Sequence, residues 1–230
     1  MRTEADRALT SHLSERLRGE TRTLHTVVER STFMGALLRG QMNRDAYCML
    51  LRNLHAIYTS LEHALLECRT HPLLAPLLLP ALFRSHALAG DLNALHGPSW
   101  QNDIALQPAT HRYVDRLHHL HDSDPALLCA HAYVRYLGDL SGGQVLKRIV
   151  AKSLQLVCGA GTSFYDFGDT DQTRDLTLAF RAGLGEMDAS EAQTDAIVNE
   201  ALGSFELHRT LFDELAIANG LTDKPTLKDR

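Results

Sequence analysis

Residues 131–148, HAYVRYLGDLSGGQVLKR, contain the most unusual feature of this chain. Apolar residues recur there at steps of three and four, which predicts a helix, yet Gly138, Gly142 and Gly143 lie in its interior. Each glycine costs a helix about 1 kcal/mol relative to alanine, so roughly 3 kcal/mol needs a physical reason. Because Gly138 and Gly142 are four residues apart, they share one helix face and leave it without side chains.

The residues alone leave three explanations of this bare face open. Another helix packs closely against it, a flat ligand lies on it, or the helix kinks at the adjacent glycine and serine. Asp139 favours the ligand, since a carboxylate is costly to bury unless it is hydrogen-bonded or paired. Tyr133, Arg135 and Tyr136 precede it on the previous turns and could form such a polar network.

The rest of the chain shows the same helical periodicity. Its 40 Leu against 8 Val and 5 Ile also favour helices, because β-branched side chains lose rotamer freedom there. We therefore expect an all-α, single-domain bundle of about eight helices over residues 1–230, with an ordered core at about 9–219. The expected helices are at about 9–30, 32–39, 43–65, 81–96, 108–121, 125–156, 170–184 and 190–219.

Composition and charge narrow the class of protein. With 44% hydrophobic and 22% charged residues, the 230-residue chain has the composition of a soluble globular protein. A net charge of −5 argues against a nucleic-acid partner. The longest apolar stretch, residues 73–83, is too short for a membrane anchor, and no secretory signal precedes it. Single cysteines at 48, 68, 129 and 158 indicate reduced thiols and a cytoplasmic location.

The first expected helix carries a candidate metal ligand, His25. Leucines and Val28 form the apolar stripe of this helix, and His25 lies at the edge of that stripe. Arg18 and Arg22 precede it by about two turns and one turn, an arrangement that suits a flat apolar ligand with anionic edges. The alternative is that His25 packs against the core and that both arginines are solvated.

Several other chemistries lack their sequence signatures. The chain has no Walker A motif and no G-x-G-x-x-G, so no nucleotide, flavin or nicotinamide site is indicated. No glutamate is followed by histidine three residues later, which argues against a di-iron bundle. Signatures of serine hydrolases, zinc proteases and catalytic cysteines are missing as well.

Four segments resemble the heme oxygenases of the vertebrate and bacterial type. They are 24–34 (LHTVVERSTFM), 53–62 (NLHAIYTSLE), 108–118 (PATHRYVDRLH) and 131–148. The resemblance runs from about residue 9 to residue 217. It implies a heme oxygenase-like fold in which heme lies between a proximal helix and a kinked, glycine-rich distal helix.

The resemblance also implies roles for individual residues. His25 matches the proximal ligand of the heme iron. Asp139 matches the carboxylate that holds the distal water network. The other matched positions are Gly138, Gly142 and Gly143 on the distal helix, Tyr58, Tyr113 and Arg135 beside Asp139, and Arg18, Tyr133 and Arg181 at the heme propionates. Two positions depart from the pattern: Thr177 replaces a frequent propionate-binding lysine, and His208 replaces a common asparagine of the distal network.

The function implied is the O₂- and electron-dependent opening of the heme ring to biliverdin, with release of CO and Fe²⁺ and with the α isomer favoured. Heme b would be both cofactor and substrate. A separate reductase or ferredoxin would supply the electrons to a monomeric enzyme. A heme carrier or sensor on the same fold is the first alternative, although a carrier has no need of Asp139. A helical interaction protein, with glycines that serve packing only, is the second.

Overall fold

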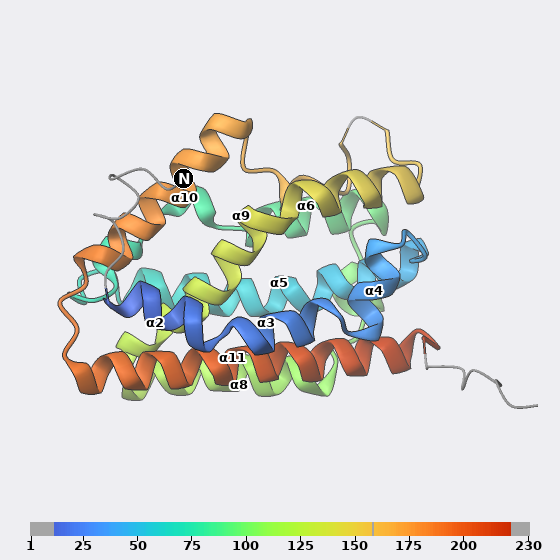
Figure 1. Cartoon of the computed structure of the whole chain (residues 1–230). Coiled ribbons are helices and arrows are strands. Elements are labelled where there is room, and N and C mark those ends of the chain that lie inside the picture. The colour runs from blue at the N-terminus through green and yellow to red at the C-terminus, as the bar shows by residue number, and fades with distance from the viewer. Residues whose placement is uncertain (1–11, 158, 222–230) are drawn as a thin grey trace, which may run out of the picture.

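The computed structural model describes residues 12–157 and 159–221. Within these ranges the secondary structure consists of ten α-helices and four short 3₁₀ helices, with no strand (Figure 1). The expected all-α class is therefore confirmed.

The helices follow one another closely along the chain. The α-helices are α2 (His12–Glu20), α3 (Arg22–Glu29), α4 (Thr32–Leu38), α5 (Arg44–Glu67), α6 (Ser85–Leu95), α7 (Trp100–Asp103), α8 (Pro108–Ser123), α9 (Leu128–Ser153), α10 (Thr170–Glu186) and α11 (Glu191–Ala218). The 3₁₀ helices are η1 (Ala75–Leu77), η2 (Pro80–Leu82), η3 (Pro125–Leu127) and η4 (Ser163–Tyr165).

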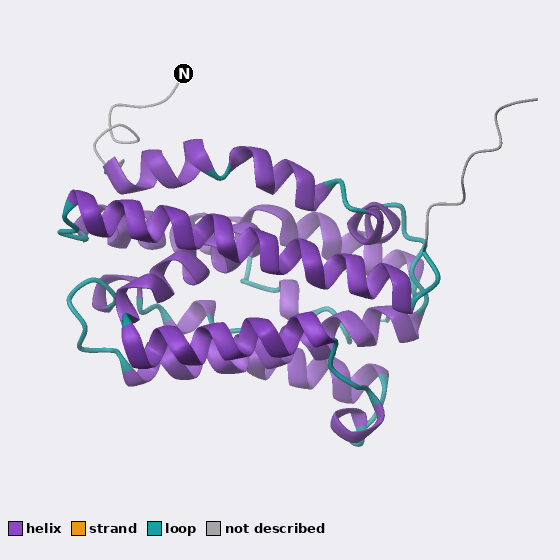
Figure 2. Ribbon diagram, turned by 90° about the horizontal axis from the view of Figure 1, so that it is seen from below, coloured by secondary structure: helices purple, strands orange, loops and turns teal. Residues whose placement is uncertain are grey.

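The long helices form the body of the bundle. In Figure 1, α8 and α11 lie along the bottom, α5 crosses the middle, and α6 and the end of α9 lie along the top. Helix α5 packs against α6 and α8, and α11 packs against α8 and α9, so the layers share one core. The view from below shows the long helices running roughly alongside one another (Figure 2). Four tyrosines lie fully inside this core: Tyr47, Tyr58, Tyr113 and Tyr136.

Local capping signals explain where several helices begin. The Asn43 side chain accepts a hydrogen bond from the Ala46 amide at 2.8 Å and starts α5. Ser190 and Gln193 form a capping box at the start of α11. Such caps contribute about 1 kcal/mol each.

The expected helix at 9–30 is interrupted in the structure. Residues 9–11 lie outside the described ranges, and the remainder is divided into α2 and α3 at Thr21. The Thr21 hydroxyl donates a hydrogen bond to the Leu17 carbonyl at 2.6 Å. A hydroxyl that bonds back to the preceding turn often bends a helix. Periodicity did not reveal the break, because the apolar stripe continues across it.

Two further elements differ from the expectations. Helix α6 begins at Ser85 and not near residue 81, because Pro80 starts the short 3₁₀ helix η2 before it. Helix α7 has four residues, which is too short for a periodic pattern to predict.

Helix α9 remains one helix through its glycines. Figure 1 shows it rising obliquely past α2 and then turning to run along the top of the molecule. The change of direction lies in the middle of the helix, as expected from the glycine-rich stretch.

The cysteines and the hydropathy of the helices bear on disulfide bonding and on membrane crossing. Cys48, Cys68 and Cys129 are free thiols, and burial raises the pKa of Cys129 to about 12. Cys158 lies outside the described residues. Across those residues, no helix combines the length and the apolar character that a bilayer crossing requires.

Gly183 of α10 provides a test of the packing between α10 and η1. A methyl group there would lie 2.9 Å from the carbonyl carbon of Pro76 and 3.2 Å from Leu77 Cδ2. We expect Gly183→Ala to lower the free energy of unfolding by about 1–3 kcal/mol in urea denaturation, because the backbone of η1 must move. The control is Gly203→Ala on α11, where the methyl group meets open space and should add about 0.5–1 kcal/mol. Equal effects of the two changes would contradict this packing.

Candidate functional site

Gly138 and Gly142 present an open backbone face on α9. A Cβ atom built at either residue meets no atom of the described chain within 4 Å. No helix from residues 12–157 or 159–221 therefore occupies this face, which contradicts the explanation that these two glycines serve packing only. The space beside them suits a flat ligand.

Gly143 differs from the other two glycines. A Cβ atom there would lie 3.6 Å from Tyr165 Cδ1, and the residue is buried against η4. Because each residue rotates by about 100° around a helix, Gly143 lies well away from the face that Gly138 and Gly142 share. The small size of Gly143 lets Tyr165 approach α9. Its role on the distal helix, implied by the resemblance, stays a prediction.

His25 lies on α3 with its side chain 46% exposed. Its ring stands edge-on to Phe205 of α11, with centroids 5.8 Å apart. The Nδ1 atom lies 3.5 Å from Glu29 Oε2, an arrangement in which a carboxylate orients an imidazole for metal binding. In the described part of the chain, no group is bonded to Nε2, so this nitrogen is free to bind a ligand.

Thr21 and Tyr133 lie close enough for the Thr21 side chain to affect the pKa of Tyr133, which relates the start of α3 to α9. Thr21 connects α2 to α3, and Tyr133 lies on α9. His25 follows Thr21 by four residues, and Gly138 follows Tyr133 by five. The helix that carries the imidazole therefore approaches the helix that carries the bare face.

Two arginines lie around Tyr133. Burial raises the pKa of the Tyr133 hydroxyl, and Thr21 and the charges of Arg181 and Arg18 oppose this rise. The charges of both arginines thus act on Tyr133. The resemblance implied a role at one ligand edge for these three residues, and that role stays a prediction. Among the described residues, neither guanidinium has a carboxylate within the 4.0 Å of an ion pair. Unpaired guanidinium groups suit an anionic ligand such as a carboxylate.

Thr177 does not extend this cationic edge. Its hydroxyl donates to the Thr173 carbonyl at 2.8 Å, within α10. Its hydrogen is therefore used inside the helix, and its side chain carries no charge.

Asp139 is held by a compact polar cluster under the glycine face. Its carboxylate is 10% exposed and accepts a hydrogen bond from the Tyr58 hydroxyl of α5. Arg135 Nη2 lies 3.4 Å from Asp139 Oδ1, and Arg135 Nε donates to the Tyr58 hydroxyl at 3.0 Å. Burial raises the pKa of Asp139, whereas Arg135 and Tyr58 lower it. Two of the three residues expected beside Asp139, Tyr58 and Arg135, are thus in direct contact with it.

Tyr113 belongs to a neighbouring cluster and is not bonded to Asp139. Its hydroxyl lies 2.8 Å from Ser204 Oγ and 3.1 Å from His131 Nδ1. His131 Nε2 in turn lies 3.0 Å from Glu200 Oε1, and Arg116 also binds Glu200. Although burial raises the pKa of Glu200, hydrogen bonds from His131 and Arg116 lower it to about 2.

This second cluster was not found from the sequence. His131 and Glu200 are 69 residues apart, and no sequence motif pairs them. Only the packing of α9 against α11 brings them together. The one available signal of a buried polar cluster was Glu200, a charged residue among the apolar positions of α11.

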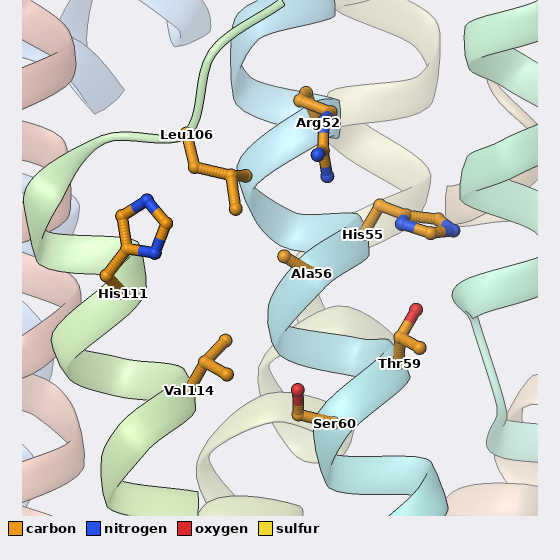
Figure 3. Close-up of a pocket in the computed structure, with 8 residues that line it drawn as sticks. All are labelled: Arg52, His55, Ala56, Thr59, Ser60, Leu106, His111 and Val114. Atoms are coloured by element: carbon orange, nitrogen blue, oxygen red, sulfur yellow. The ribbon is translucent and has the colours of Figure 1, made fainter. Parts of the chain in front are cut away.

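A separate cavity of about 280 Å³ lies between α5 and α8 (Figure 3). Burial, followed by the charge of Arg52, lowers the pKa of His55 in its wall to about 4. None of the residues assigned to the site lines this cavity. Its lining residues are Arg52, His55, Ala56, Thr59, Ser60, Leu106, His111 and Val114.

Comparisons with known proteins agree on one family. The family model described as heme oxygenase matches residues 11–214. The heme oxygenase of Porphyra purpurea is 38% identical over 207 residues, which cover 90% of this chain and 88% of the relative. Human heme oxygenase 1 is 39% identical over 205 residues, covering 88% of this chain and 71% of the relative. The crystal structure of heme oxygenase-2 from Synechocystis sp. PCC 6803 in complex with heme and NO is similar, with a TM-score of 0.87, 38% identity and coverage of 90% of this chain and 86% of that one.

The open face of α9 makes a prediction about the free protein. Gly138→Ala and Gly142→Ala should each raise the free energy of unfolding by about 0.5–1 kcal/mol, because alanine favours a helix and its methyl group meets open space. Urea denaturation of the ligand-free protein checks this. A loss of stability like that expected for Gly183→Ala would mean that these glycines are packed.

Proposed function

We propose that this chain, which belongs to the heme oxygenase family and is a heme-degrading oxidoreductase, opens the ring of heme b to biliverdin with release of CO and Fe²⁺. The α isomer is the expected product. The observation that carries the proposal is the bare backbone face of Gly138 and Gly142, with the buried carboxylate of Asp139 directly beside it.

The described residues fit heme on three counts. His25 offers an unbonded imidazole nitrogen to the iron, and the open face of α9 accepts a flat ring. Arg18 and Arg181, which form no ion pair with a carboxylate of the described residues, would offer positive charge to the two propionates, and both charges act on Tyr133. When bound, heme supplies the iron at which O₂ is reduced, and its own ring is the substrate.

Each wall of the site has a distinct task. His25 would hold the iron, and Glu29 would orient the imidazole through Nδ1. Helix α9 presents no side chain at Gly138 and Gly142 that could bind the iron or shield the ring. Bound heme would therefore supply its own ring as the group open to oxidation.

Asp139 holds and moves the proton that the reaction needs. Tyr58 and Arg135 fix the carboxylate in place, and burial brings its pKa upward from the usual value. A carboxyl group with a raised pKa exchanges protons closer to neutral pH than an exposed one does. A water molecule on Asp139 would carry the proton across the open glycine face.

The electrons come from a separate protein, a reductase or a ferredoxin. The sequence has no nucleotide-binding motif that would serve an internal reductase. Adding each class of donor to the heme-bound protein and following its absorption spectrum would identify the donor that supports turnover.

His25→Ala tests the proximal assignment. We expect heme affinity, measured by titration of the Soret band, to fall at least about tenfold, because the iron loses its protein ligand. Bilin formation should stop, and added imidazole should restore part of the spectrum. His111→Ala, an exposed histidine on α8, is the matched control and should leave both unchanged. Normal turnover of His25→Ala would exclude His25 as the iron ligand.

Asp139→Ala tests the proton-delivery role. Heme affinity should stay within about threefold of the wild type, while bilin formation falls roughly 100-fold, the usual scale for a positioned acid or base. The measurement is chromatography of the pigment against the four biliverdin isomers, with the wild type yielding the α isomer. Asp122→Ala, whose side chain is 79% exposed, is the control. An unchanged bilin yield from Asp139→Ala would remove Asp139 from the reaction.

A further inference from the structure

His208 of α11 is buried beside the Asp139 cluster without touching Asp139. Its residue is 2% exposed, and its ring stands edge-on to Tyr113, with centroids 5.1 Å apart. Nδ1 lies 3.1 Å from the Ser204 carbonyl oxygen, and Nε2 contacts Arg135 Nη1. Both ring nitrogens therefore have a protein partner.

These two partners determine the tautomer of the imidazole. A carbonyl oxygen only accepts, so Nδ1 of His208 carries the hydrogen. A guanidinium group only donates, so Nε2 must present a lone pair to Arg135. The arrangement is satisfied only by a neutral ring with its hydrogen on Nδ1.

We propose that His208 is a positioning residue whose neutral imidazole accepts a hydrogen bond from Arg135 and thereby aims the guanidinium at Tyr58 and Asp139. The inference rests on the proposed function, in which Asp139 moves the proton. It assigns His208 a role through Arg135 and no contact with heme.

The geometry of Arg135 explains why such an acceptor matters. Each of its three nitrogens has one partner: Nε bonds Tyr58, Nη2 pairs with Asp139, and Nη1 bonds His208. The guanidinium is a rigid plane, so a fixed Nη1 sets the direction of the other two nitrogens. Without an acceptor, this buried N–H would be unsatisfied and the plane would rotate toward another partner.

The surroundings keep the His208 ring neutral. Burial lowers the pKa of His208, and the charge of Arg135 and the neighbouring His131, both from α9, lower it further. Tyr113 faces it from α8, and the Ser204 carbonyl is the group that opposes the shift. No carboxylate of the described chain contacts the ring, so no negative charge favours its protonated form.

Ser204 connects His208 to the second cluster. Its carbonyl accepts from His208 Nδ1, while its hydroxyl lies 2.8 Å from the Tyr113 hydroxyl. Tyr113 contacts His131, which bonds the ionised Glu200. The hydrogen bonds that run from Glu200 through His131 and Tyr113 to Ser204 thus fix the turn of α11 that carries Ser204. The carbonyl group of this turn is the partner of His208 Nδ1.

The first test uses the wild-type, heme-free protein. Nitrogen-15 NMR should show His208 as the Nδ1–H tautomer with no protonation between about pH 5 and pH 9, a range around the ordinary histidine pKa. Loss of the signal in His208→Asn assigns it. An Nε2–H tautomer, or a protonation midpoint inside this range, would overturn the proposal. This measurement does not depend on heme chemistry.

The second test compares two substitutions of similar size. The Asn oxygen of His208→Asn can still accept from Arg135, whereas His208→Leu cannot. In the heme-free protein, carbon-13 NMR of the Asp139 carboxyl should show a midpoint raised by about one pH unit or more in His208→Leu, because an aimed Arg135 stabilises the carboxylate. His208→Asn should titrate like the wild type. Identical titrations of the two variants would show that His208 has no positioning role.

A third test measures the rate of bilin formation by the His208 variants, which relates the inference to the reaction. His208→Leu should lower the rate of bilin formation about tenfold or more and shift its pH profile in the direction of the Asp139 midpoint, with heme affinity unchanged. His208→Asn should restore both. If the wild type formed no bilin, the proposed function would fail, while the tautomer and the Asp139 titration would still decide the role of His208. If His208→Leu failed to fold, the wild-type NMR measurement would decide it alone.

Discussion

The contact on which the site depends is the buried pairing of Asp139 with Arg135 and Tyr58. A carboxylate and a guanidinium are expensive to remove from water unless each hydrogen-bonding atom finds a partner. Here the partners come from three different helices, since Tyr58 lies on α5, Arg135 on α9 and His208 on α11. The same bonds that satisfy the charges therefore hold these helices in register, and the position of the open face of α9 follows from them.

The bare face and the polar cluster lie on two sides of α9, and each side requires different residues. Gly138 and Gly142 lower the stability of the helix but leave open space beside its backbone. Arg135 and Asp139, in contrast, are buried and need hydrogen-bond partners. Helix α9 meets both demands because positions one turn apart share a face and adjacent positions do not. Gly143 follows the same rule. It comes one residue after Gly142, and that rotation takes it from the open face to the side that packs against Tyr165.

Features that depend on neighbouring residues could be predicted from the sequence. The helical class was correctly predicted from local spacing, and the Asn43 cap and the Ser190 capping box arise from the same kind of local pattern. The break at Thr21 and the pairing of His131 with Glu200 could not be predicted, because they depend on a back-bonded hydroxyl and on contacts between distant segments. The roles of Arg18 and Arg181 were suggested by resemblance, and only the folded chain shows that both charges act on Tyr133.

The open space beside Gly138 and Gly142 creates a conflict between stability and the proposed activity. Alanine at either position improves the helix and, in the proposed function, also narrows the space that heme would occupy. Under that proposal, selection for heat resistance alone would accumulate changes that lower activity. An engineering programme for this scaffold should leave both glycines unchanged and seek added robustness elsewhere, for example at the exposed Gly203.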